Sequence, residues 1–313
     1  MFLLKWNMGN GKSYKITCHE LFSSRDNILI KIWSRIKIGQ LIDHYRPFQA
    51  LSLDVCLGAV AGGIYASSVI DYSPPIAYFV ILFLAVFFIY TLDHLIDARR
   101  IGKKTTRFRY QFHNQHFVFI SFFTFVSGFL ALFAALYYLS AAIIWGGLLL
   151  FVGVVIHLIL AQYTRLPFMK EFSVAFYYTT GIWLVPLVEG KALNVTVWAY
   201  FALFYLSVFV SLALFSFFEI KEDRKDGSNS IAVFLGEQKS KWLIRVLLVI
   251  CLVLLFYTWY LAEESQKYIV GPAIVLFVHF FMFFFPGFFN KNEIYRIVGD
   301  GVFLVYAYIF FFF

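Results

Sequence analysis

Long runs of apolar residues alternate with short polar segments along this chain. Nine of the runs have about the 20 residues that a helix needs to cross a bilayer. They cover residues 48–70, 76–96, 117–139, 141–162, 172–188, 195–218, 242–262, 269–289 and 294–313. The pattern predicts an all-α polytopic membrane protein with nine transmembrane helices.

The composition agrees with a membrane location and changes the meaning of the net charge. Of the 313 residues, 61% are hydrophobic, 22% are aromatic and 14% are charged, and the formal net charge is +8. A soluble domain has about 25% charged residues. In a membrane protein, an excess of Lys and Arg marks cytoplasmic loops. The positive charge therefore does not indicate a nucleic-acid partner.

The distribution of basic residues predicts the orientation in the membrane. With the N-terminus in the cytoplasm, the loops after the even-numbered spans hold most of the loop Lys and Arg residues, as the positive-inside rule requires. Residues 1–45 form a basic segment before the first span. We expect this segment to be either an interfacial helix or a loosely ordered cytoplasmic tail, and we expect residues 46–313 to form the transmembrane domain.

Two short acidic patches interrupt the apolar pattern, at the cytoplasmic ends of the second and sixth spans. Asp93 and Asp97 form the first pair, and Glu219 and Asp223 form the second. Carboxylates four residues apart share one face of a helix, and Mg²⁺ is usually held by one or two carboxylates plus substrate phosphates. The alternative is that each carboxylate pairs with a basic residue close by in the sequence.

These patches resemble the two aspartate-rich motifs of the UbiA-type intramembrane prenyltransferases. The second motif matches over a long stretch, Glu219-Ile220-Lys221-Glu222-Asp223-Arg224-Lys225-Asp226-Gly227 followed by Ser228-Asn229-Ser230-Ile231-Ala232-Val233-Phe234-Leu235-Gly236. The first motif matches at Asp93 and Asp97, whereas Ile89 and Tyr90 stand where the family has Asn and Asp. Two smaller family features match at Arg46-Pro47 and at Tyr163 with Lys170.

The resemblance implies nine helices around a central cavity and the transfer of a polyprenyl group from its diphosphate to a lipophilic or aromatic acceptor. It implies that the catalytic, Mg²⁺-binding residues are Asp93, Asp97, Glu219 and Asp223. It implies that the substrate diphosphate is bound by Arg46, Lys104, Arg107, Tyr163, Lys170 and Lys225. The active-site mouth would face the cytoplasm, and membrane lipid would surround the helices.

Two other functions remain open at this stage. The departures at Ile89 and Tyr90 remove expected metal ligands. One alternative is therefore that the protein binds one metal ion instead of two, and another is that it is a non-catalytic relative that only binds lipid. Asp54 and Asp300 lie alone within apolar spans, where ionisable groups often mark ion pathways, so a transporter is the second alternative. The acceptor and the prenyl chain length also stay open.

Overall fold

The structure is a computed structural model of the 313-residue chain. It describes residues 4–7, 13–16, 38–102, 105, 107–163, 168–190 and 193–309. Two short strands, β1 (Leu4–Asn7) and β2 (Ser13–Ile16), pair as an antiparallel hairpin near the N-terminus. Beyond the hairpin, the regular elements of the described part are all helices.

The long helices carry the apolar runs. They are α3 (Leu53–Ile70), α4 (Ile76–Ile101), α6 (Phe117–Tyr138), α7 (Ala141–Tyr163), α8 (Met169–Glu189), α9 (Val195–Phe218), α12 (Glu237–Leu261) and α13 (Val270–Phe284). The shorter elements are α2 (Ile38–Ala50), α5 (Phe108–Gln115), α10 (Ile220–Asp226), α11 (Ile231–Leu235), α14 (Pro286–Phe289) and α15 (Ile294–Gly301), with 3₁₀ segments η1 (Glu263–Ile269), η2 (Lys291–Glu293) and η3 (Val302–Tyr308).

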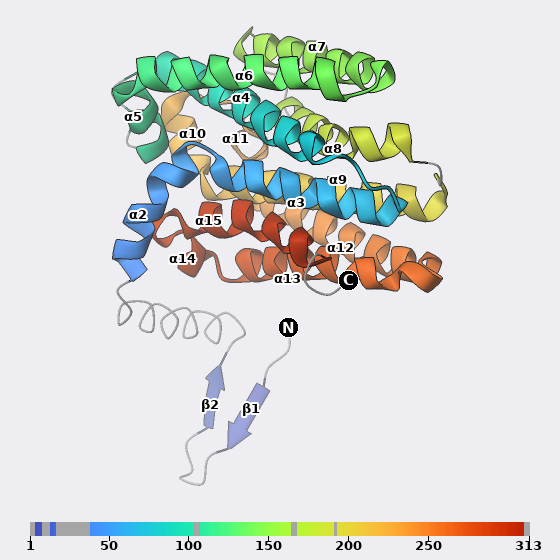
Figure 1. The fold of residues 1–313 in the computed structure, drawn as a ribbon. Coiled ribbons are helices and arrows are strands. Elements are labelled where there is room, and N and C mark those ends of the chain that lie inside the picture. The colour runs from blue at the N-terminus through green and yellow to red at the C-terminus, as the bar shows by residue number, and fades with distance from the viewer. Residues whose placement is uncertain are drawn as a thin grey trace.

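The long helices lie roughly side by side, and α2, α5, α10 and α14 gather at one end of the bundle (Figure 1). Helix α4 packs against α6, α9 packs against α12, and α3 packs against α8 and η3. Seven helical segments in the described part are long and apolar enough to cross a membrane. The all-α polytopic fold is therefore confirmed, whereas the count of nine spans stays a prediction, since α8 and the last helical region are not among these seven.

Two of the expected spans are interrupted. The span expected at 48–70 divides because α2 ends at Ala50, and Ser52 adopts a left-handed conformation with φ of 55° before α3 begins. The span expected at 269–289 ends as a helix at Phe284, and α14 starts afresh at Pro286. Proline lacks an N–H and disfavours a helical conformation in the residue before it, which explains the second break.

An aromatic cluster fills the centre of the bundle. The rings of Tyr65 and Tyr306 lie 4.6 Å apart, and those of Phe204 and Tyr306 lie 4.9 Å apart. The Trp183 side chain packs edge-on against Tyr65, and all four are fully buried. Because this cluster joins α3, α8, α9 and η3, it fixes the helices that position the residues at the end of the bundle.

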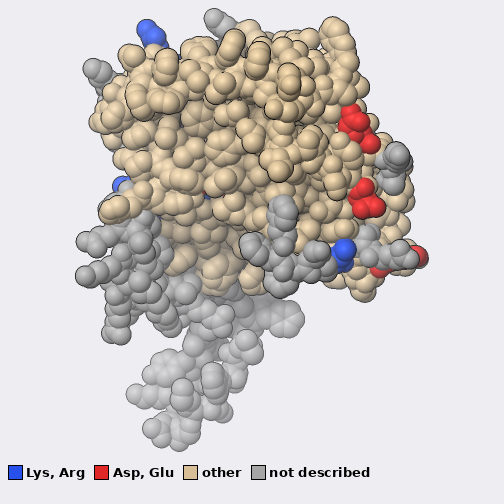
Figure 2. Space-filling model, viewed as in Figure 1, with Lys and Arg blue, Asp and Glu red and all other residues tan. Residues whose placement is uncertain are grey.

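The outer surface is mostly apolar. Large side chains such as Phe122, Phe129, Phe133 and Trp145 on α6 and α7 are exposed. Figure 2 shows one face of the molecule on which charged residues are almost confined to the margins. An apolar surface of this extent is what contact with lipid requires, since soluble monomers rarely expose contiguous apolar patches larger than a few hundred Å².

Candidate functional site

A polar cavity of about 560 Å³ opens at the end of the bundle where the short helices gather. Its lining comes from α2, the start of α3, α4, α5, α7, α8, α9, α10 and α15. Both acidic pairs line it, Asp93 and Asp97 from α4, and Glu219 and Asp223 from the α9–α10 junction. The structure therefore brings together, around one cavity, two motifs that lie more than 100 residues apart in the sequence.

The first acidic pair lies in the last turns of α4. Asp97 Oδ1 lies 2.9 Å from Arg100, and Asp97 Oδ2 lies 3.5 Å from Lys170 Nζ at the start of α8. Asp93 lies one turn earlier and makes no ion pair with the described residues. The pairing of Asp97 with Arg100 is the local ion pair that the sequence left open as an alternative.

The second acidic pair contacts arginines from distant parts of the chain. Arg107 Nη1 lies 3.1 Å from Glu219 Oε2, and its Nη2 lies 2.7 Å from Asp223 Oδ1. Arg296 forms an ion pair with Glu219 Oε1, and Tyr295 donates a 3.1 Å hydrogen bond to the same oxygen. The carboxylates of this pair are therefore neutralised by guanidinium groups and not by the neighbouring Lys221 or Lys225.

The charges in this second cluster hold one another in the ionised state. Burial by itself disfavours a charged Glu219, but Arg296 and Arg107 overcome this effect and lower its pKa. Burial also opposes the charge of Arg107, while Glu219 and Asp223 raise the pKa of Arg107 above the ordinary arginine value. Glu219 is therefore a carboxylate, and Arg107 a cation, throughout the physiological pH range.

The local sequence explains how the second pair is positioned. Glu219 follows directly on α9. Helix α10 ends at Asp226 and is capped by Gly227, whose φ of +67° is a conformation that favours glycine. The start of the next helix, α11, is held by side chains of α8 and α9. Glu171 Oε1 on α8 accepts a 2.7 Å hydrogen bond from the backbone N–H of Ile231. Ser216 Oγ accepts one from Ala232 N–H at 2.9 Å.

Replacing Glu171 with alanine is expected to lower the free energy of unfolding by about 1–3 kcal/mol, because it leaves the buried Ile231 N–H without an acceptor. Chemical unfolding of the detergent-solubilised protein measures the change. Glu171→Gln is the matched control, since its amide oxygen still accepts a hydrogen bond. If the two variants were equally destabilised, the hydrogen bond to Ile231 would not be the cause.

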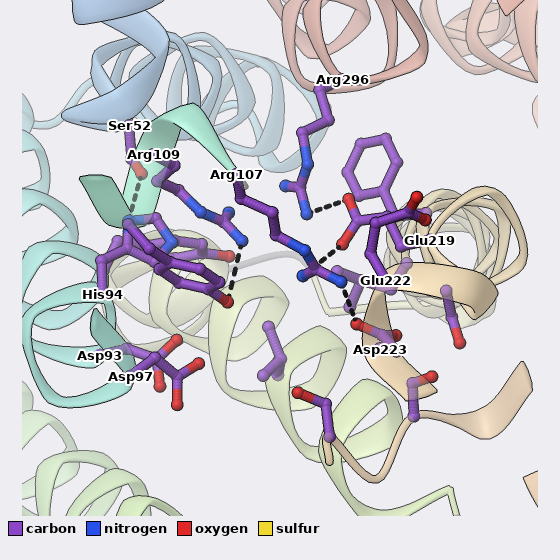
Figure 3. Close-up of a pocket in the computed structure, with 18 of the residues that line it drawn as sticks. Ser52, Asp93, His94, Asp97, Arg107, Arg109, Glu219, Glu222, Asp223 and Arg296 are labelled. Carbon is purple, nitrogen blue, oxygen red and sulfur yellow. Dashed lines mark hydrogen bonds and ion pairs between the residues drawn. The ribbon is translucent and has the colours of Figure 1, made fainter. Parts of the chain in front are cut away.

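The two acidic pairs differ in how well they fit a metal ion. They lie on opposite sides of the cavity, with Arg107 between them and directed toward Glu219 and Asp223 (Figure 3). Within the described residues, no three His, Cys, Asp or Glu side chains are grouped as a metal site. Asp93 and Asp97 still fit one Mg²⁺ completed by substrate phosphates, whereas Glu219 and Asp223 already have cationic partners.

Only some of the residues expected to bind the diphosphate line the polar cavity. Arg46, Arg107 and Lys170 line the cavity. Lys225 is exposed on α10 and does not line it. Lys104 and the side chain of Tyr163 fall outside the described residues. The first three therefore stay as candidates with a suitable position, and the geometry gives Lys225 no such support.

Two residues of the cavity were not singled out from the sequence. They are Arg296 and Tyr295, which contact Glu219 from α15. The signal for Arg296 was its position as a cation inside the ninth apolar run, where ionisable groups usually face the protein interior. No pattern in the sequence indicates Tyr295, because tyrosine is common throughout the chain.

His113 lies on helix α5, is fully buried and lines neither cavity. Its Nδ1 lies 2.9 Å from the carbonyl oxygen of Arg109, one turn earlier. Burial lowers the pKa of His113 to about 4, and the nearby Arg109 charge acts in the same direction. His113 is therefore neutral at physiological pH and is not a cation for phosphate binding.

A second, apolar cavity of about 1220 Å³ lies between α4, α6, α7 and α8. Its wall includes aromatic residues such as Phe88, Phe125 and Phe151. Tyr90, Asp93 and His157 line both this cavity and the polar one. The polar site and the apolar space are thus neighbours that meet at the first acidic pair.

Comparison with known proteins identifies the family. A family model described as the UbiA prenyltransferase family matches residues 55–293. A comparison with curated protein sequences gave no significant match.

Solved structures of a UbiA homolog from Archaeoglobus fulgidus share the fold. The structure bound to GPP and Mg²⁺ has a TM-score of 0.57 at 14% sequence identity, and the structure bound to DMAPP and Mg²⁺ has a TM-score of 0.56 at 14%. Each match covers 84% of this chain and 96% of the homolog. The family model covers well over half of the sequence and agrees with this fold, so the chain belongs to the UbiA prenyltransferase family.

Proposed function

We propose that this chain transfers a polyprenyl group from its diphosphate to a lipophilic or aromatic acceptor, with the help of Mg²⁺. The observation that carries the proposal is the junction of the two cavities at Asp93. A prenyl diphosphate has a highly charged head and an apolar tail, and here a polar site adjoins a long apolar space. The homolog structures with GPP or DMAPP and Mg²⁺ support the same class of substrate.

The diphosphate head would lie in the polar cavity beside the first acidic pair. Asp93 and Asp97 would hold a magnesium ion, which when bound offsets negative charge on the leaving diphosphate. Lys170 and Arg100 already contact Asp97 and are partly exposed, so they can turn toward phosphate oxygens. Arg46 lines the same cavity and adds a third cation to this side.

The prenyl tail would lie in the apolar cavity, with its first carbon near Tyr90. The Tyr90 ring lines both cavities and lies 6.0 Å from the ring of Tyr178. As the bond to the diphosphate breaks, positive charge develops on the allylic carbons. Aromatic faces attract a cation by roughly 0.5–2 kcal/mol each, so Tyr90 has a role at the position where other family members have a metal ligand.

The cytoplasmic orientation completes the proposal. The cavity lies at the ends of the helices that the basic loops follow in the sequence, including Arg99, Arg100 and Arg109 after the second span. Excess Lys and Arg on one side marks the cytoplasm. The mouth would therefore open to the cytoplasm, where a soluble or membrane-bound prenyl diphosphate can enter.

The transporter alternative gains no support from the two isolated aspartates. Asp54 lies in the first turn of α3 and accepts a 3.2 Å hydrogen bond from Tyr45, while Asp300 lines the polar cavity. Both carboxylates therefore belong to the end of the bundle that holds the site. A transport route needs polar groups at several depths of the membrane, and these two do not supply them.

A transfer assay tests the proposal. The purified protein, with Mg²⁺ and a radiolabelled prenyl diphosphate, should release diphosphate and form a labelled lipid when a suitable acceptor is present. The acceptors to try include aromatic ring precursors, porphyrin derivatives and glycerol phosphates. Binding without turnover across the whole panel would instead identify a non-catalytic lipid-binding relative.

Filling the apolar cavity is expected to discriminate against long prenyl chains. Gly181 on α8 lines this cavity, and a Cβ there would meet no side chain within 4 Å. Gly181→Leu should therefore lower kcat/KM for a long polyprenyl diphosphate by about tenfold or more, with a smaller effect on a five-carbon substrate. Competition between the long and the five-carbon substrate measures the ratio of their kcat/KM values.

The control for this variant is Gly301→Leu. Gly301 also has open space at its Cβ position, but it lines neither cavity. An unchanged ratio in Gly181→Leu, or an equal change in Gly301→Leu, would contradict the placement of the tail.

A further inference from the structure

The two acidic pairs differ in how firmly their cations are held. The partners of Asp97 are accessible from the polar cavity that they line, since the Arg100 and Lys170 side chains are 37% and 42% exposed. The partners of the second pair are buried, with Arg107 at 10% and Arg296 at 16%. An exposed ion pair is weak and easily exchanged, whereas a buried one cannot lose a partner without leaving an uncompensated charge.

Arg107 has an acidic neighbour at each of its three nitrogen atoms. Nη1 and Nη2 donate hydrogen bonds to Glu219 and Asp223, whereas Nε lies 3.3 Å from Asp226 Oδ2 without hydrogen-bond geometry. The guanidinium group also lies 5.7 Å from the centre of the Tyr110 ring. A planar guanidinium fork of this kind matches carboxylates in a fixed geometry that a lysine cannot reproduce.

Arg296 is fixed from the opposite side. Its guanidinium group lies over two aromatic rings, 5.4 Å from the centre of Phe215 and 6.0 Å from that of Tyr295. It pairs with Glu219 Oε1, which also accepts the hydroxyl of Tyr295. Both oxygens of Glu219 are therefore occupied, one by Arg107 and the other by Arg296 and Tyr295.

These contacts occupy three of the four carboxylate oxygens of the second pair, both of Glu219 and Oδ1 of Asp223. A divalent cation at Glu219 and Asp223 would have to displace two buried guanidinium groups, which together carry the same +2 charge. Displaced arginines would remain close to the site and would repel the incoming ion. The donor set at Glu219 and Asp223 thus does not fit a second magnesium ion, in contrast to Asp93 and Asp97.

We propose that Arg107 and Arg296 take the place of a second metal ion, so that this chain binds a single divalent cation at Asp93 and Asp97. This inference rests on the proposed function for the first site only. The fixed positive charge at the second motif would face the far side of a bound diphosphate, across the cavity from the first pair (Figure 3).

Counting bound Mn²⁺ by electron paramagnetic resonance tests the inference. The purified chain is titrated with Mn²⁺ in the presence of an unreactive prenyl thiolodiphosphate. We expect one ion per chain in the wild type, at least tenfold weaker binding in Asp97→Asn, and binding within twofold of wild type in Glu219→Gln. Asp223→Asn replaces Glu219→Gln if the latter does not fold.

The outcomes separate this inference from the proposed function. Two Mn²⁺ ions in the wild type would overturn the inference and leave the proposed function intact. Loss of the ion in Glu219→Gln with retention in Asp97→Asn would overturn the inference and also the metal site proposed at Asp93 and Asp97. No Mn²⁺ in the wild type would overturn both.

Discussion

Replacing Asp97 with asparagine is expected to lower the rate of prenyl transfer by about 10²–10³-fold, the range seen when one group that stabilises transition-state charge is removed. The amide keeps the shape of the side chain but removes the negative charge that a magnesium ion needs. It also removes the ion pairs with Arg100 and Lys170. Release of diphosphate from a radiolabelled substrate measures the rate.

The matched control is Asp71→Asn. Asp71 ends α3 in a left-handed conformation with φ of 56°, which asparagine tolerates well, and it lines neither cavity. Its substitution should leave the rate within about twofold of wild type. A rate in Asp97→Asn equal to that of Asp71→Asn would show that the first acidic pair takes no part in the reaction.

Replacing Arg107 with methionine is expected to lower the free energy of unfolding by about 3–5 kcal/mol, because it leaves the buried Asp223 without its cationic partner and removes one of the two cations at Glu219. The corresponding change at the exposed Arg100, which is 37% exposed, should cost no more than about 1 kcal/mol. Denaturant unfolding of both variants under identical detergent conditions gives the comparison. Equal effects at the two positions would contradict the difference in burial.

The pH dependence of this stabilisation follows from the lowered pKa of Glu219. A carboxyl group whose pKa is lower in the folded protein stabilises the fold above its unfolded pKa of about 4.3. The contribution is lost as the pH falls through the lower, folded pKa. The difference in stability between wild type and Arg107→Met should therefore be present at neutral pH and shrink under strongly acidic conditions.

Much of this molecule could be predicted from local patterns. The long apolar helices follow directly from hydrophobicity, and α9 has the predicted bounds, Val195–Phe218. The acidic pairs were visible because charged residues are costly next to apolar runs. The combination of two such pairs with the Gly227–Gly236 stretch was specific enough to indicate the family.

The parts that could not be predicted depend on contacts between distant residues. Arg107 and Glu219 are 112 positions apart, and nothing in either local sequence indicates that one neutralises the other. The break at Ser52 was missed because it lies inside an apolar run and has no proline or glycine to mark it. The sequence favoured four equivalent metal ligands, whereas tertiary contacts give the second pair two arginine partners.

The most direct test of the whole account is to locate a bound prenyl diphosphate. A prenyl diphosphate carrying a photoreactive group at its tail, added with Mg²⁺ and irradiated, should label residues of the apolar cavity such as Phe88, Phe125 and Phe151. Peptide mass spectrometry maps the label, which should disappear in Asp97→Asn or when the metal is chelated. Label on the outer faces of other helices, or labelling that is independent of Asp97 and of the metal, would contradict the account.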